Sequence, residues 1–190
     1  MIPYRQKEEI FMRPTSIRKI AKVLDLLVIT ALICNLIALL IVPGLVFASP
    51  QARTSMLFSL DIPYFLLAWA AVWGDAYLAV LTLFLLFSGV CTAVILAQAL
   101  IVLGSILKGC PFCGKNAHAL RRAAVCAFLI SAAALVRVVF SLFYCRSLQP
   151  LATYNALFVP IFAMFGLLCL VMSALFRQAS ELKAENDLII

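Results

Sequence analysis

The residues best suited to chemistry lie in one polar loop, residues 109–122, with the sequence GCPFCGKNAHALRR. It contains Cys110 and Cys113 in the C-x-x-C spacing used for thiol–disulfide exchange, and His118, the only histidine of the chain. Two thiolates and an imidazole are also ligands that zinc prefers. The redox conditions around the loop decide between these chemistries, so its function depends on the elements that position it.

The composition is that of an integral membrane protein. Of the 190 residues, 66% are hydrophobic and only 12% are charged, and the mean hydropathy is +1.13. Such a chain has too little polar surface to coat a water-soluble core. Its net charge of +7 lies beside apolar runs, which indicates membrane orientation and no direct binding of nucleic acid. The first apolar run, from Val23, is too long for the core of a cleaved signal peptide.

The apolar runs predict an all-α membrane protein, with a single transmembrane domain over residues 1–190. We expect four spans, at residues 19–42, 77–107, 116–144 and 154–176, followed by a polar tail at residues 177–190. The apolar stretch 63–107 is long enough for two spans, or for one span preceded by an interfacial helix over residues 63–73.

The distribution of charge chooses between these two arrangements. Of the 15 Lys and Arg residues, six lie in residues 1–22, four in 108–122 and two in 177–190. One span after Asp75 puts all three clusters on the cytoplasmic side, in keeping with the positive-inside tendency. We therefore expect a multi-pass protein of the cytoplasmic membrane with both termini cytoplasmic and the interfacial helix on the outer side.

Three polar side chains fall at a similar depth in the expected spans. Asn35 lies about ten residues into the first span, Gln98 nine residues from the inner end of the second, and Ser131 nine residues beyond Arg122 in the third, or roughly 13 to 15 Å deep. An unpaired amide in hydrocarbon is costly, so we predict that these groups face one another. They would then act as packing contacts or as a polar path for a substrate.

Arg137 is the one charge inside the span 116–144, and it adjoins a stripe of small residues. The stripe consists of Ala124, Ala127, Ser131, Ala134 and Ser141. Helical spacing therefore predicts that Arg137 points into the bundle, with Asp75 as its best-placed acidic partner. A structural anchor and a site for a ligand or ion both remain open.

The expected chemistry of the loop cysteines changes if the loop lies in the reducing cytoplasm. There Cys110 and Cys113 are expected to be ordinary thiols rather than a redox pair. With His118 they supply three zinc ligands and no fourth, so a zinc site would have to be shared across a dimer. We expect no cofactor and no catalytic residue.

Two patterns carry a family resemblance. One is Pro111-Phe112, then Asn116, then Leu120-Arg121-Arg122, and the other is the ending Glu185-Asn186-Asp187-Leu188-Ile189. Together they resemble the signature and ending of a bacterial four-helix membrane family, domain of unknown function 2975. The flanking cysteines are not part of that signature. The resemblance implies an uncharacterised membrane protein, often encoded beside a small helix-turn-helix regulator.

Both patterns fall on the predicted cytoplasmic side, where we expect loop and tail to pack into one cytoplasmic platform. Its residues are Pro111, Phe112, Asn116, Leu120, Arg121, Arg122, Glu185, Asn186, Asp187 and Leu188. The leading hypothesis is a non-enzymatic sensor or sequestering component that lies in the lipid bilayer and binds a cytoplasmic regulator. The alternatives are a small transporter or resistance protein for a lipophilic compound and, less favoured, a membrane thiol oxidoreductase. Homo-oligomerisation is left open.

Overall fold

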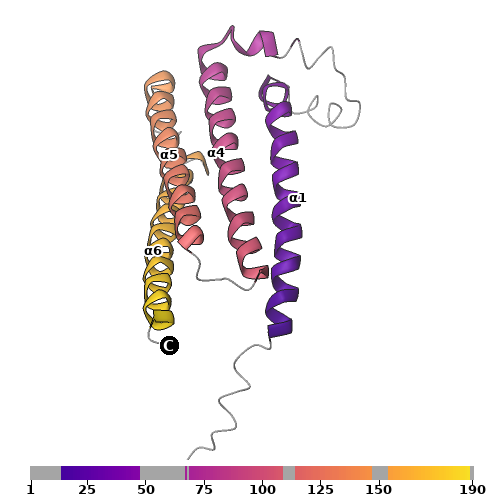
Figure 1. Ribbon diagram of the computed structural model, residues 1–190. Helices are drawn as coiled ribbons and strands as arrows, with labels where there is room; N and C mark the ends of the chain where they lie inside the picture. The colour runs from indigo at the N-terminus through magenta and orange to yellow at the C-terminus, as the bar shows by residue number, and fades with distance from the viewer. Residues whose placement is uncertain (1–13, 48–66, 68, 109–113, 147–153, 189–190) are drawn as a thin grey trace, which may run out of the picture.

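The computed structural model describes residues 14–47, 67, 69–108, 114–146 and 154–188. These residues form the helices α1 (Pro14–Phe47), α4 (Ala76–Leu107), α5 (Gly114–Cys145) and α6 (Tyr154–Leu188). Within the described ranges, 4 helices are long and apolar enough to cross a membrane. The chain is therefore an all-α, multi-pass membrane protein (Figure 1).

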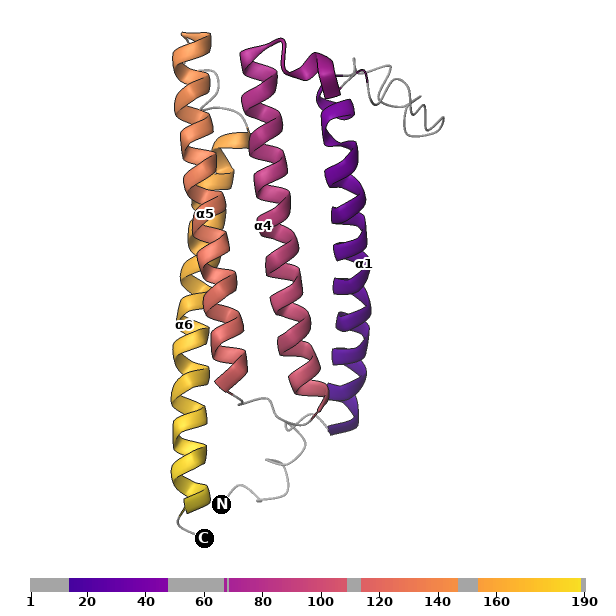
Figure 2. The ribbon, with the colours of Figure 1, turned by 45° about the horizontal axis from the view of Figure 1, so that its top comes forward.

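The helices alternate in direction, and each packs on the long helix that follows it in the chain. Figures 1 and 2 show α1 along one edge, α4 in the middle, and α5 with α6 on the other side. The central apolar segment of α5 is 44% buried, whereas that of α1 is 0% buried. α5 is thus the helix around which the packing is built, and α1 contacts the bundle mainly through α4.

Large apolar side chains lie exposed on all four helices. Leu40 of α1, Val136 of α5 and Leu168 of α6 are each more than 60% exposed. In water this much exposed apolar surface would be unfavourable, but lipid chains cover it in a bilayer. The pattern fits the expected spans, because the membrane and not a protein core surrounds most of the bundle.

Small residues explain the tight packing of α5 on α6. Ala124, Ala127 and Ala134 are at most 1% exposed, so the small-residue stripe is the buried face of α5. On α6, a Cβ added to Gly166 would lie 3.1 Å from the ring of Phe128. Small side chains let two helix backbones approach closely, which is a common way to associate helices in lipid.

α4 begins at a well-formed cap. The Asp75 carboxylate accepts a hydrogen bond from the Tyr77 backbone N–H at 2.8 Å, which satisfies one of the donors left free at a helix start. Residues 69–72 before it are helical and cross the end of the bundle near α1 and α4 (Figure 1). This stretch lies within the predicted interfacial helix over residues 63–73, of which residues 63–66 and 68 are outside the described part.

α6 differs from the expected span over residues 154–176, because the helix does not end there. It continues without a break to Leu188, so the described part of the polar tail is helical. No Gly or Pro follows Phe176, and the sequence is rich in good helix formers. The Arg177 Nε atom also lies 2.9 Å from Glu181 Oε1, a pair with the i,i+4 spacing that supports exposed helices.

Candidate functional site

The basic end of the bundle, where α4 ends and α5 begins, carries most of the described positive charge. Since the helices alternate in direction, the starts of α1 and α5 and the ends of α4 and α6 all lie here (Figure 2). The exposed cations at this end are Lys19, Lys22, Lys108, Lys115, Arg121, Arg122 and Arg177. The three basic clusters of the sequence therefore contribute cations to a single end of the molecule.

A groove between α4 and α5 opens at the basic end. It has a volume of about 380 Å³ and is lined by His118, Arg121, Arg122, Val125 and Cys126 of α5, with Val94 of α4. The α5 residues follow the spacing i, i+3, i+4, i+7 and i+8, which puts them on one face of the helix. The three basic residues were predicted as candidates, whereas the apolar wall was not, although this spacing could have revealed it.

The opposite face of α5 is fixed against α6, and this contact turns the groove residues outward. The Ser173 hydroxyl of α6 donates a hydrogen bond to the Ala117 carbonyl at 2.8 Å. Beside it, Asn116 is fully buried, and Ala123 and Ala124 are 5% and 0% exposed. His118, Arg121 and Arg122 lie on the exposed side of the same helix turns. The groove is thus positioned by the best-packed pair of helices.

The platform residues are only partly described. Asn116 is buried, Leu120 is half-buried, and Arg121, Arg122 and Glu185 are exposed. Pro111 and Phe112 lie outside the described residues, as do the side chains of Asn186, Asp187 and Leu188, although the helical backbone reaches Leu188. The predicted contact between loop and tail falls on those residues.

Arg137 points into the bundle and is buried, as its place beside the small-residue stripe predicts. The residue is 8% exposed, and its guanidinium carbon lies 4.7 Å from the centre of the Phe84 ring. A cation in this position is attracted by the negative face of the ring. Arg137 therefore contacts α4 through an aromatic side chain.

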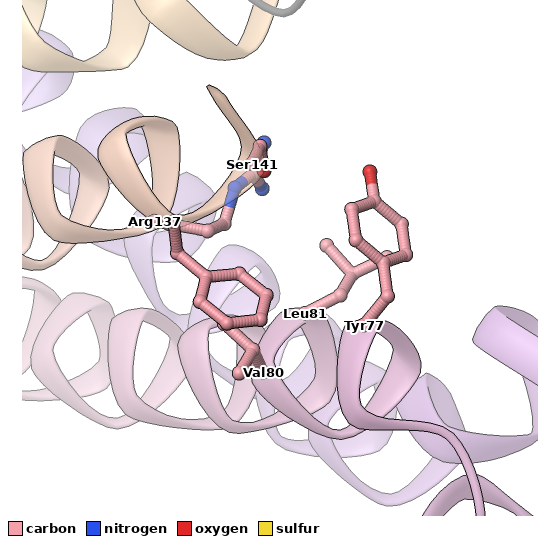
Figure 3. A pocket seen from close by; sticks show the side chains of 6 residues that line it. Tyr77, Val80, Leu81, Arg137 and Ser141 are labelled. Carbon is pink, nitrogen blue, oxygen red and sulfur yellow. The ribbon is translucent and has the colours of Figure 1, made fainter. Parts of the chain in front are cut away.

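The predicted pairing of Arg137 with Asp75 is not formed. Asp75 is exposed and caps α4, and within the described ranges no carboxylate lies within ion-pair distance of Arg137. Tyr77, Leu81 and Ser141 lie around Arg137 (Figure 3), and the space between these side chains is too small to hold a water molecule. This part of the bundle is closed to a ligand in the present arrangement.

The prediction that Asn35, Gln98 and Ser131 face one another is wrong. The Ser131 hydroxyl donates instead to the Val159 carbonyl of α6 at 2.9 Å. Asn35 Oδ1 and Gln98 Oε1 are buried and accept no hydrogen bond from the described part of the chain. The three side chains therefore form no shared polar cluster.

The register of the helices explains this result. Val94, one turn before Gln98 in α4, lines the groove with Arg122 and Val125 near the start of α5. Ser131 lies two to three turns further along α5, or roughly 14 Å from the level of Arg122. The depth of Ser131 was counted from Arg122, but Arg122 lies about two turns after the start of α5 at Gly114. Gln98 therefore lies near the basic end, whereas Ser131 lies deep in the bundle.

The described cysteines form one contact between helices. The Cys91 thiol of α4 lies beside that of Cys126 of α5. Cys110 and Cys113 lie outside the described residues, so their predicted grouping with His118 stays a prediction. Among the residues that are described, no three His, Cys, Asp or Glu side chains are grouped to hold a metal ion.

Comparison with known proteins gives one match. A family model described as "Protein of unknown function (DUF2975)" matches residues 67–190, which cover α4, α5, α6 and the basic groove. Neither a curated protein nor a solved structure shows significant similarity to the chain. The match covers most of the chain and agrees with the resemblance of the loop and tail.

Proposed function

This chain belongs to the DUF2975 family of proteins of unknown function, and from that premise we propose that it is a non-enzymatic membrane component that binds a cytoplasmic protein. The partner is proposed to be a small helix-turn-helix regulator, which the bundle holds at the membrane or releases. The single observation that carries the proposal is the length of α6. Its final part, the projecting segment of residues 177–188, extends beyond the helix it packs on.

The extent of this projection follows from the packing of α6 on α5. Ser173 lies level with Ala117, near the start of α5, because their hydrogen bond joins the two helices there. α6 then runs on to Leu188, or about 22 Å further along its axis. A bilayer core needs only about 20 apolar residues, so the segment beyond Arg177 is more than a span requires.

The side chains of the projecting segment suit a helical partner. Leu182 is 63% exposed, and the same face continues back to Leu175, which lies before the segment and is 53% exposed. The charged pair Arg177 and Glu181 lies on a different side of the helix, more than about 100° from this face. Apolar side chains one or two turns apart on an exposed helix are typical anchors for a groove on another protein. Regulators of the proposed class are small helical domains that can offer such a groove.

The basic end also supports a cytoplasmic location for the segment. Seven exposed cations lie there, including those on α1, α4 and α5, and the positive-inside tendency favours the cytoplasm for such an end. A transporter would need a continuous polar path through the bundle. That function has less support, because Asn35, Gln98 and Ser131 do not meet.

The experiment is co-purification of the full chain from native membranes, comparing Leu182→Asp with Ala184→Asp. Both residues are exposed, and both changes add one negative charge. Ala184 lies on the opposite side of the helix from Leu182, in line with Ser173, the residue that contacts α5 nearer the bundle. We expect the unchanged protein and the Ala184→Asp protein to recover a DNA-binding regulator. Leu182→Asp should lower that recovery about tenfold or more, because it puts a charge into an apolar contact.

Two results would contradict the proposal. One is the absence of any DNA-binding protein from the unchanged sample. The other is an equal loss with both substitutions, which would indicate general repulsion rather than a docking face. Equal elution volumes of the purified variants in detergent would show that folding is preserved.

A further inference from the structure

We propose that the groove between α4 and α5 is a binding site for one anionic phospholipid. Its basic side chains, His118, Arg121 and Arg122, would hold the headgroup phosphate. Its apolar wall, Val94 with Val125, would lie against the first part of an acyl chain. The site lies on the face of α5 turned away from α6, so this inference goes beyond the proposed function and does not depend on a protein partner.

The charge of the groove is the first argument for an anion. Its lining residues include His118, Arg121 and Arg122 and none of the six is acidic, although most of the surface that lines the groove is apolar. In the described part of the chain the one ion pair is Arg177 with Glu181, so no described carboxylate neutralises Arg121 or Arg122. The consecutive residues Arg121 and Arg122 carry like charges that repel each other, and a phosphate bound by both would remove that repulsion.

The order of residues along the groove is the second argument, and it indicates a lipid rather than a free anion. His118, Arg121 and Arg122 lie in the first turns of α5, whereas Val125 and Cys126 lie closer to the centre of the bundle. The lining therefore changes from basic to apolar over about 12 Å along the helix. A phospholipid has the same change from phosphate to hydrocarbon in the same direction, since its headgroup lies at the membrane surface.

The size and openness of the groove are the third argument. A volume of about 380 Å³ is larger than a phosphate ion needs and is within the usual range for a small-molecule site. Val125, which forms part of the wall, is 52% exposed on the lipid-facing surface. An acyl chain could therefore leave the groove directly into the bilayer. Basic pockets between transmembrane helices are known to favour anionic headgroups.

The test is native mass spectrometry of the full-length protein in detergent, titrated with phosphatidylglycerol or with phosphatidylcholine of the same acyl chains. We expect the first phosphatidylglycerol to bind at least about tenfold more tightly than phosphatidylcholine, because two arginines would contact the anionic headgroup. The double substitution Arg121→Gln with Arg122→Gln should abolish this preference.

A matched control separates the groove from the general charge of the basic end. Lys19→Gln with Lys115→Gln removes the same charge from two exposed cations that do not line the groove. This variant should keep the preference for phosphatidylglycerol. A second variant, Val125→Trp, leaves the charge unchanged and fills the groove, and it should weaken binding of the first lipid about tenfold.

Three outcomes would overturn the proposal. They are equal binding of the two lipids by the unchanged protein, an equal loss of preference in the two double variants, and displacement of phosphatidylglycerol by inorganic phosphate at millimolar concentration. The last outcome would make the groove a site for a free anion. Unchanged thermal unfolding of the variants in detergent would exclude misfolding as the cause.

Discussion

Arg137 is a cation held inside the bundle by an aromatic ring. Its guanidinium carbon lies 4.7 Å from the centre of the Phe84 ring, and the residue is 8% exposed. Removing a buried charge relieves its desolvation cost, whereas removing a long side chain leaves unfilled space. The two effects can be separated by two substitutions at this position.

We predict that Arg137→Met changes the free energy of unfolding by less than about 1 kcal/mol, because Met keeps most of the volume and removes the charge. Arg137→Ala should lower it by about 1 to 3 kcal/mol, because it leaves a cavity beside Phe84. Thermal unfolding of the full chain in detergent measures both. If Arg137→Met were as unstable as Arg137→Ala, the charge itself would be required, and a ligand or ion site at Arg137 would be favoured.

Some properties of single residues could be predicted from the sequence, and others depend on the register between helices. Spacing along one helix was enough to predict that Arg137 and the small residues of α5 are buried. To predict whether Asn35, Gln98 and Ser131 contact one another, the positions of three helices along the bundle axis would have to be known. The depth of Ser131 was counted from Arg122, which lies about two turns inside α5, and this misplaced Ser131 relative to Gln98. Composition and periodicity carry no signal for such a difference in level.

α5 is the element that determines both the packing and the groove. One face is made of small residues that pack on α6, and the face with His118, Arg121 and Arg122 borders the groove with α4. The contact with α6 depends on close approach, since a Cβ on Gly166 would meet three atoms of the Phe128 ring at 3.1 to 3.2 Å.

We predict that Gly166→Val lowers the free energy of unfolding by about 1 to 3 kcal/mol, because it forces α6 away from Phe128. Gly104→Val in α4 is the matched control, since a Cβ there would meet no atom within 4 Å. The control should change stability by less than about 1 kcal/mol. Thermal unfolding in detergent compares the two, and an equal loss at both positions would contradict the packing of α5 on α6.

The helices themselves could be predicted from the sequence better than the contacts of single residues. Long apolar runs are enough to predict four spanning helices, and the structure has them. The continuation of α6 past Phe176 was missed because the end of the apolar run was taken as the end of the span. A change in polarity marks the edge of a membrane, but only a stop signal such as Gly or Pro marks the end of a helix.

For the whole molecule, the orientation in the membrane remains a prediction from charge. Most of the exposed cations gather at one end, whereas Cys145 and Arg146 lie exposed at the other. We predict that a membrane-impermeant maleimide labels Cys145 on intact cells when it is the only cysteine. A single cysteine made by Lys115→Cys should react only after the cells are opened. The reverse pattern would place the basic end outside and remove the basis for a cytoplasmic partner.

The central claim is that the exposed face of the projecting segment contacts a regulator in the cell. The most direct measurement is photo-crosslinking in living cells, with a photoreactive residue placed at Leu182 or at Ala184, which are both exposed. The account predicts that Leu182 crosslinks to a small DNA-binding protein, identified by mass spectrometry, and that Ala184 does so at least about tenfold less. Crosslinks from Leu182 to lipid alone, or equal yields of the regulator from both positions, would contradict it.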